Sequence, residues 1–218
     1  MADHDRYSPD RGNGGAADIL EDIFGVAADP QSYLNVVYHL LGLPLGTAYF
    51  VFLVTGISLG LGLLVIGVGL LILLAVLLGW YALAAFEREM VIRMLRVPIP
   101  PMSRPGSPNQ DIFSRLRDLL RNPITWKSLF YLFARFPLGI FSFSVAVTAI
   151  AFTVAMVTAP LTYKYAPTVA GLIYINTQNE AILCSLLGLV VGVASLHLMN
   201  GLAYVQARFA KFMLGSGE

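Results

Sequence analysis

A run of 47 residues, from Leu40 to Phe86, contains no Asp, Glu, Lys or Arg. Built as an α-helix, this run would be about 70 Å long, whereas one crossing of a bilayer's hydrocarbon core takes about 30 Å. The run therefore predicts two membrane-spanning helices joined by a short turn. The whole chain is 57% hydrophobic and only 12% charged, far fewer charges than a soluble domain carries. We predict an all-α integral membrane protein.

Four spans account for the apolar segments of the chain. We expect them at about residues 39–59, 63–86, 131–158 and 181–204. Nine of the fourteen basic residues lie between positions 87 and 135, whereas the loop between the third and fourth spans has one, Lys164. Basic segments stay on the cytoplasmic side of a membrane. The sequence therefore predicts a multi-pass protein of the cytoplasmic (plasma) membrane with both termini in the cytoplasm.

The two halves of the chain resemble each other. A shift of 93 positions aligns residues 18–57 with residues 111–150 without a gap and gives 11 identities in 40 positions. A shift of 119 aligns residues 83–95 with residues 202–214. The most distinctive matches are Tyr38, Pro44, Leu45 and Gly46 in the first half and Tyr131, Pro137, Leu138 and Gly139 in the second. We expect two tandem, parallel helical-hairpin repeats related by a pseudo-twofold axis along the membrane normal.

The repeat divides the chain into segments. We expect a disordered cytoplasmic tail at 1–17, repeat 1 at 18–97, a Pro-rich linker at 98–110, repeat 2 at 111–215 and, within it, an outer loop at 159–180. Each repeat is expected to begin with an interfacial amphipathic helix, continue through two spans and end in a juxtamembrane helix. The outer loop belongs to repeat 2 alone and accounts for the change in shift between the two alignments.

Small residues in the spans are expected to let helices approach closely. They are Gly56 and Gly60 at the end of the first span, and Ser185, Gly188, Gly192 and Ser195 in the fourth. Pro44 and Pro137 are expected early in their spans, where a missing N–H costs little. Arg135 is expected to snorkel to the inner interface.

The sequence offers little for catalysis or ion transport. We find no nucleophile motif, no paired carboxylates on one helix face and no relay of ionisable groups at membrane depth. His39 and His197 are the one pair that could ligate a b-type haem. Their repeat counterparts, Leu132 and Leu78, are apolar, so we expect each imidazole to hydrogen-bond a carbonyl or water, and we expect no cofactor or metal. The single cysteine, Cys184, is expected to be a packing residue.

Several segments resemble a known family. Tyr38–Leu71 (YHLLGLPLGTAYFVFLVTGISLGLGLLVIGVGLL), Leu83–Leu95 (LAAFEREMVIRML) and Tyr131–Phe143 (YLFARFPLGIFSF) are similar to the family named putative sensor, found ahead of two-component histidine kinases. The resemblance covers about residues 30–214. It implies a four-helix membrane module that receives a signal and passes it to a kinase, which we expect to be a separate chain. It implies no individual site residue.

These features favour a non-catalytic sensor or signalling module that couples a membrane or extracytoplasmic signal to a separate cytoplasmic partner. The expected input residues lie in the outer loop: Tyr163, Lys164, Tyr165, Tyr174 and Asn176. Expected partners are the lipid bilayer and protein chains at the cytoplasmic face or within the membrane, in a homo- or hetero-oligomer, with no nucleic acid. The alternative is a structural or accessory subunit of a larger membrane complex. A small transporter comes third.

Overall fold

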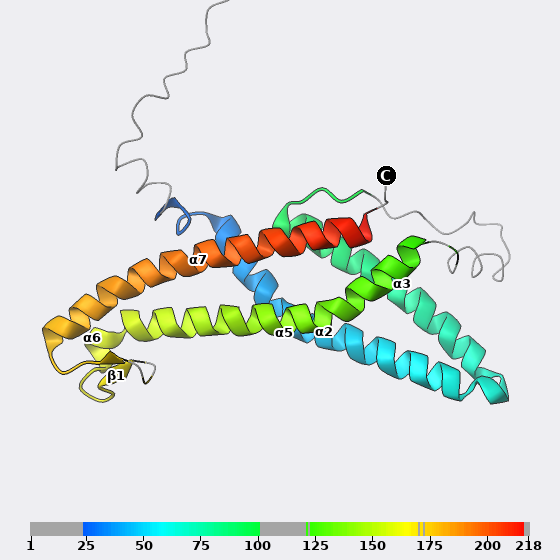
Figure 1. Ribbon diagram of the computed structural model, residues 1–218, viewed down its shortest axis with the longest axis horizontal. Helices are drawn as coiled ribbons and strands as arrows, with labels where there is room; N and C mark the ends of the chain where they lie inside the picture. The colour runs from blue at the N-terminus through cyan, green and yellow to red at the C-terminus, as the bar shows by residue number, and fades with distance from the viewer. Residues whose placement is uncertain (1–23, 101–120, 122, 170, 172, 216–218) are drawn as a thin grey trace, which may run out of the picture.

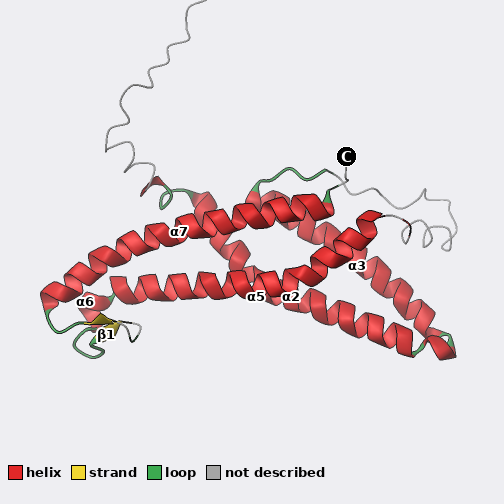
Figure 2. Ribbon diagram, in the orientation of Figure 1, coloured by secondary structure: helices red, strands yellow, loops and turns green. Residues whose placement is uncertain are grey.

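Four long helices make up most of the protein. The structure is a computed structural model that describes residues 24–100, 121, 123–169, 171 and 173–215. The long helices are α2 (Pro30–Gly62), α3 (Val68–Leu95), α5 (Pro123–Val157) and α7 (Gln178–Leu214) (Figures 1 and 2). Each is long and apolar enough to cross a membrane. The prediction of an all-α chain with four candidate spans is confirmed.

The helices extend well beyond the predicted spans. α2 begins at Pro30, where proline suits a first helical position, and the Asp29 carboxylate accepts a hydrogen bond of 2.9 Å from the Gln31 N–H. α5 likewise begins at a proline, Pro123. Pro44 and Pro137 therefore lie well inside continuous helices. The expectation that they lie early in their spans is wrong, because α2 and α5 already begin at Pro30 and Pro123, ahead of the predicted span starts at about 39 and 131.

The two hairpin connections differ in size. α2 and α3 are joined by a short 3-10 turn, η1 (Leu64–Ile66), and then Gly67, whose φ of 80° favours glycine. α5 and α7 are joined by the short helix α6 (Ala159–Thr162) and a two-stranded antiparallel ladder of β1 (Thr168–Val169) and β2 (Ile173–Tyr174). Beyond this ladder, Thr177 and Glu180 form a capping box that starts α7.

The two hairpins meet where α2 crosses α5, and glycines make that crossing tight. A Cβ added to Gly46 would lie 2.7 Å from the Arg135 carbonyl oxygen, and one added to Gly139 would lie 2.6 Å from the Gly42 carbonyl carbon. The 93-residue shift relates Gly46 to Gly139 and Gly42 to Arg135, so these two contacts are counterparts. Away from the crossing, the hairpins diverge, with the α2–α3 turn and the α6–β1 loop at opposite ends of the molecule (Figure 1).

Within each hairpin, a glycine of the second helix packs against the end of the first. A Cβ on Gly69 would lie 2.6 Å from the Leu63 carbonyl carbon, and one on Gly188 would lie 2.7 Å from the Met156 Cβ. The 119-residue shift relates the two glycines and the 93-residue shift relates Leu63 to Met156. The two hairpins therefore use corresponding positions to approach closely.

Other predicted packing residues lie in the same hairpin seams. Gly56 and Gly60 face Val76 and Leu73, Gly192 faces Thr153, the Ser185 hydroxyl donates to the Val157 carbonyl, and the Ser195 hydroxyl donates to the Val191 carbonyl of its own helix. Cys184 is buried with Met156, Ala159 and Ala181 at the loop end of α5 and α7. Each of these predicted residues thus packs, or hydrogen-bonds, within the chain.

Some predicted segments lie outside the described residues. They are the tail at 1–17, most of the first amphipathic segment, all of the second at 111–120, and linker residues 101–110. Predictions for these segments therefore stay predictions.

The tight crossing predicts that Gly139→Ala destabilises the protein. The added methyl meets the backbone of Gly42, which cannot rotate away, so we expect a loss of about 1–3 kcal/mol in unfolding free energy. Unfolding in detergent, followed by circular dichroism, measures the change. The matched control is Gly201→Ala, because nothing lies within 4 Å of that position in α7; there alanine is expected to stabilise by about 0.5–1 kcal/mol. Equal effects at the two glycines would contradict the crossing.

Candidate functional site: a buried charged cluster where the spans meet

Each helix presents one stripe of buried residues to its neighbours. On α3 the stripe is Val76, Leu77, Trp80, Ala84, Glu87 and Val91, and on α5 it is Tyr131, Leu132, Arg135, Gly139, Ser142 and Ala146. Steps of three and four residues keep side chains on one helix face, and both stripes follow the same steps. Glu87 and Arg135 each occupy a stripe position, so both charged side chains point into the protein.

Glu87 and Arg135 form a buried ion pair. The Arg135 Nε lies 2.8 Å from the Glu87 Oε1, and the two side chains are 1% and 0% exposed. The expectation that Arg135 snorkels to the interface is therefore wrong. An arginine can leave the membrane interface for the interior when an opposite charge at the same depth offsets the loss of its hydration, and Glu87 supplies that charge from another helix.

Three tyrosines surround the Glu87 carboxylate. The hydroxyls of Tyr49 and Tyr131 donate to it at 3.0 and 3.1 Å, and that of Tyr38 donates at 3.5 Å. The Arg135 guanidinium also lies over the Tyr38 ring, and the guanidinium carbon Cζ is 4.4 Å from the ring centroid. This is a cation–π geometry. The carboxylate's lone pairs are thus taken up by protein donors, which is what a buried charge requires.

A fourth helix joins through Gln206. The Arg135 Nη1 donates to the Gln206 Oε1 at 3.1 Å, and Gln206 is 5% exposed. Gln206 is the counterpart of Glu87 under the 119-residue shift, as Tyr131 is of Tyr38 under the 93-residue shift. Arg135 therefore lies between two counterpart positions, one charged and one neutral. We call Tyr38, Tyr49, Glu87, Tyr131, Arg135 and Gln206 the charged cluster.

A second polar network links α2 to α7 beside this cluster. The Asn35 side chain donates to Asn200 at 2.9 Å, and Asn200 donates to the Ser32 hydroxyl at 2.9 Å. Gln31 donates to Asn35 and to the carbonyl of Met94 at the end of α3. The indole N–H of Trp80 on α3 donates to the Ser128 hydroxyl on α5 at 3.0 Å. The first helix of each hairpin, α2 or α5, is thus hydrogen-bonded to the second helix of the other hairpin, α7 or α3.

The two histidines lie in different environments. His39 is fully buried and its Nε2 donates to the Met199 carbonyl at 3.0 Å, which confirms the predicted carbonyl bond for this residue. His197 is exposed on α7. Within the described residues no group of three or more His, Cys, Asp or Glu side chains is arranged to hold a metal ion.

The outer-loop candidates gather around the small β ladder. Tyr165 and Tyr174 are 91% and 69% exposed, and the Lys164 ammonium lies over the Tyr163 ring at 5.9 Å. The Asn176 N–H donates to the Glu180 carboxylate at 2.8 Å. Val169 and Ile175 are buried against the ends of α5 and α7, so the loop is anchored while its aromatic side chains remain accessible.

The charged cluster is not among the sites that the sequence predicts. Glu87 lies just past an uncharged run and Arg135 near a predicted interface, so neither position by itself indicates a partner. The available signal is periodicity: Glu87 continues the Trp80–Ala84 stripe by three residues, and Arg135 continues that of Tyr131 by four. Two opposite charges on apolar stripes are expensive unless they meet, but periodicity alone does not show which helix faces meet.

The comparisons with known proteins gave one match. A family model described as Putative sensor matches residues 38–214, a range that contains the whole charged cluster. Neither the curated proteins nor the solved structures contained a match.

The buried ion pair predicts strong non-additivity between its two residues. Arg135→Met leaves the Glu87 carboxylate buried without its counter-charge and should cost about 3–5 kcal/mol of stability. Adding Glu87→Gln to that variant should restore more than half of the loss, because the remaining groups are neutral. A double-mutant cycle on detergent-solubilised protein measures this coupling. Additive losses would mean that the two side chains do not interact.

Proposed function

Since the chain belongs to the Putative sensor family, we propose that it is a non-catalytic membrane module that senses a membrane or extracytoplasmic signal and passes it to a separate cytoplasmic partner. The observation that carries the proposal, beyond the family itself, is the charged cluster, to which all four long helices contribute. A displacement of one helix changes the hydrogen bonds of the others, which is what a signal-coupling element requires.

The input end, in this proposal, is the loop between α5 and α7. It is much longer than the η1 turn of the other hairpin, and it exposes Tyr165 and Tyr174. Exposed aromatic side chains on an anchored loop suit recognition of a ligand or of another protein's surface. The anchoring residues Val169 and Ile175 would transmit a displacement of the loop to α5 and α7.

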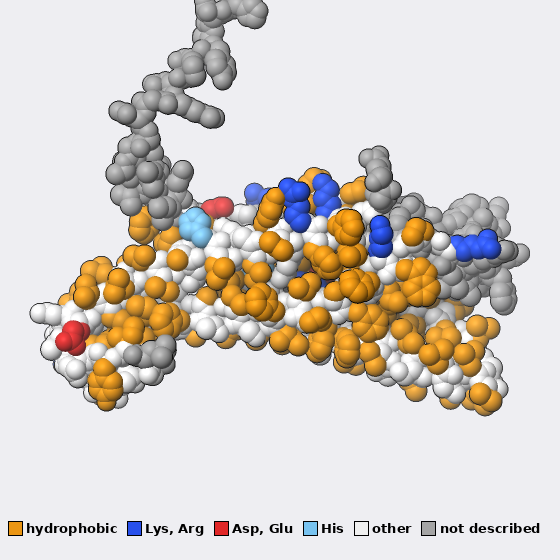
Figure 3. Space-filling model, viewed as in Figure 1, with side chains coloured by type: hydrophobic (Ala, Val, Ile, Leu, Met, Phe, Trp, Pro, Cys, Tyr) orange, Lys and Arg blue, Asp and Glu red, His pale blue; other side chains and the backbone are white. Residues whose placement is uncertain are grey.

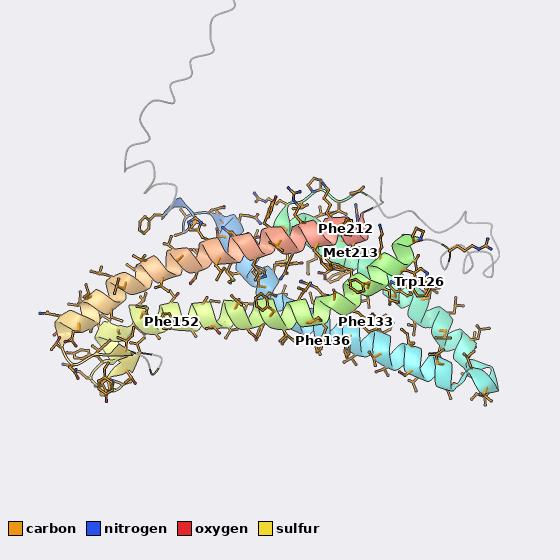
Figure 4. The ribbon with its side chains drawn as sticks, viewed as in Figure 1. Trp126, Phe133, Phe136, Phe152, Phe212 and Met213 are labelled. Atoms are coloured by element: carbon orange, nitrogen blue, oxygen red, sulfur yellow. The ribbon has the colours of Figure 1, made fainter. Side chains whose placement is uncertain are left out.

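In this proposal, the output end is formed by the C-terminal ends of α3 and α7. Leu214 is fully buried, and Leu95, Met94 and Met213 pack against the same hydrophobic cluster, so the two helix ends behave as one surface. Figure 4 shows Phe212, Met213 and Trp126 at this end of the molecule, and Phe212 and Trp126 are 68% and 54% exposed. An exposed aromatic surface of this kind suits a protein partner.

Lysine and arginine side chains support the proposed orientation. On the face shown in Figure 3 they gather along one edge of the molecule, and hydrophobic side chains are spread over the rest of that face. These bases lie at the α3, α5 and α7 ends away from the β ladder: Arg93, Arg96, Lys127, Arg208 and Lys211. By the positive-inside rule that edge is cytoplasmic, with both termini on the same side of the plasma membrane.

The proposal includes the tandem-repeat architecture. Support comes from contacts that correspond under the two shifts: Gly46 with Gly139 at the crossing, and Gly69 with Gly188 inside the hairpins. A duplicated hairpin whose halves cross at glycines has a pseudo-twofold axis through the crossing, close to Arg135. Most residues of the cluster come from paired positions around this axis, so the cluster can respond to either hairpin.

A structural or accessory subunit is the second candidate, and exposed apolar surface favours it. Only 17% of the most apolar window of α5, and likewise of α7, is buried within the chain. Lipid covers such surface in a bilayer, and helices of partner subunits can do so equally well. If this candidate is right, the chain would be found in stable stoichiometry with other membrane proteins.

One experiment separates the two candidates. The chain is extracted gently from its native membrane, the co-purifying chains are identified by mass spectrometry, and the activity of the recovered partner is measured in vesicles. We expect Lys164→Ala/Tyr165→Ala to change the partner's activity at least threefold and to leave the complex intact. Leu161→Ala, at a 78% exposed position of the same connection, is the matched control and should change neither.

The opposite pattern supports the accessory subunit. If Gly188→Leu dissolves a stable complex of transport or redox subunits, whereas the loop substitutions change no activity, the sensor proposal is wrong. Gly188 faces Met156 and Val157, so its substitution separates α5 from α7 without touching the loop surface.

A further inference from the structure

A groove of about 440 Å³ lies between α5 and α7. Its length follows α5 from Ala146 to Val154 and α7 from Leu189 to Met199. Phe24 lines it as well, on the chain that leads into α2. A volume of this size lies within the range of ligand-binding clefts in proteins, and the lining residues include no charged side chain.

The corresponding positions of the other hairpin are filled, and the groove of about 600 Å³ between α2 and α3 lies at other positions of that seam, among them Leu45 and Gly79. The 119-residue shift relates Ser195 and Met199 to Val76 and Trp80, and the 93-residue shift relates Ala146 to Leu53. Leu53, Val76 and Trp80 are 0%, 6% and 5% exposed. Replacing these larger side chains by alanine, serine and methionine removes the volume that closes the seam. At this place in the seam, the groove is therefore a feature of the second hairpin alone.

A second pair of facing positions also leaves less side-chain volume in the second hairpin than in the first. In the first hairpin Gly60 accommodates Leu73, with 2.6 Å between an added Cβ and the Leu73 Cδ2. At the corresponding place in the second hairpin, Thr153 lies opposite Gly192, with 3.0 Å between an added Cβ and the Thr153 Cγ2. The second pair is smaller, and the Thr153 hydroxyl is buried without a hydrogen-bond partner.

The chemistry of the groove decides its occupant. The distance along α7 from Leu189 to Met199 is about 15 Å of helix, roughly half of the 30 Å hydrocarbon core. The chain's own residues 18–23 precede Phe24 and carry Asp18, Glu21 and Asp22. Drawing three carboxylates to that depth would cost several kcal/mol, whereas a hydrocarbon chain enters such a groove without burying any charge.

From these observations we propose that the α5–α7 groove binds one acyl chain of a membrane phospholipid, which enters sideways from the leaflet on the Phe24 side. The inference rests on the proposed membrane-sensor function and names the bilayer lipid as its ligand. An acyl chain wedged between α5 and α7 sets their separation, and Met199 connects the groove to His39 through its carbonyl group. The lipid is thereby placed next to the polar contacts that join α2 and α7.

Photolabelling of the full chain tests the proposal. The purified protein is reconstituted in phosphatidylcholine vesicles that contain a trace of phosphatidylcholine with a diazirine in mid-chain, irradiated, and mapped by mass spectrometry. We expect label on the groove residues Val193 and Met199, which are 8% and 2% exposed, at least fivefold above that on lipid-facing Leu183 and Leu187, which are 60% and 52% exposed. Uniform labelling of all apolar positions would overturn the proposal.

Variants that copy the first hairpin fill the groove. Thr153→Gly/Gly192→Leu recreates the Gly60–Leu73 pair, and Ala146→Leu is a milder filling change that introduces the side chain of its counterpart, Leu53. Either variant should lower groove labelling at least fivefold, to the level of the exposed positions, and leave labelling at Leu183 unchanged. Leu187→Trp is the matched control, because it adds bulk to α7 outside the groove.

Two further outcomes complete the test. Filled variants that keep their circular dichroism and gel-filtration profiles and still label the groove would overturn the proposal. An increase in groove labelling after removal of residues 1–23 would mean that the N-terminal segment covers the groove, which also overturns it. Labelling needs no partner protein, so failure here leaves the sensor proposal standing, and failure of the signalling experiment leaves the lipid site standing.

Discussion

The attraction between Glu87 and Arg135 is the interaction on which the arrangement of the spans depends. In water such a pair would contribute little, because both ions are well hydrated. In the interior of a membrane protein neither ion has that alternative, so each must find its counter-charge and its hydrogen bonds inside the chain. The carboxylate lies on α3 and the guanidinium on α5, and the tyrosines and Gln206 bring in α2 and α7. Satisfying one buried pair thus requires all four helices to meet at one place.

The glycines make that meeting geometrically possible. Gly46 and Gly139 let the α2 and α5 backbones approach within van der Waals contact, directly beside the turn of α5 that carries Arg135. A side chain at either glycine would push the two helices apart, and the guanidinium would then lose its reach to Glu87. Beyond the crossing the hairpins diverge (Figure 1), so close packing is concentrated near the cluster and the outer parts of the helices are left to lipid or to partner proteins.

The two hairpins use corresponding contacts but have diverged in what they offer. At the level of Trp80 the seam of the first hairpin is filled, whereas the second hairpin has an apolar groove at the corresponding level. The first hairpin has a minimal turn, and the second has an anchored loop with exposed tyrosines. The charged cluster is asymmetric in the same way: Arg135 is the counterpart of Gly42, and Glu87 is the counterpart of the neutral Gln206. A hairpin with a filled seam at this level and a hairpin that carries both proposed binding surfaces suit a membrane sensor.

Some properties of this protein follow from its sequence alone. The uncharged run from Leu40 to Phe86 determines two of the four helices, because no soluble fold hides that much apolar surface, and the matched Pro-Leu-Gly motifs point to a duplicated hairpin. The helix ends could not be placed, since residues 30–38 and 123–130 continue into the apolar runs as one helix, through Pro44 and Pro137. Nor could Arg135 be paired: it lies 48 positions from Glu87, and periodicity shows only which face a side chain occupies. Which faces meet, and which small residues leave a groove between them, was decided by the tertiary structure, because burial of charge and volume depends on neighbours from other helices.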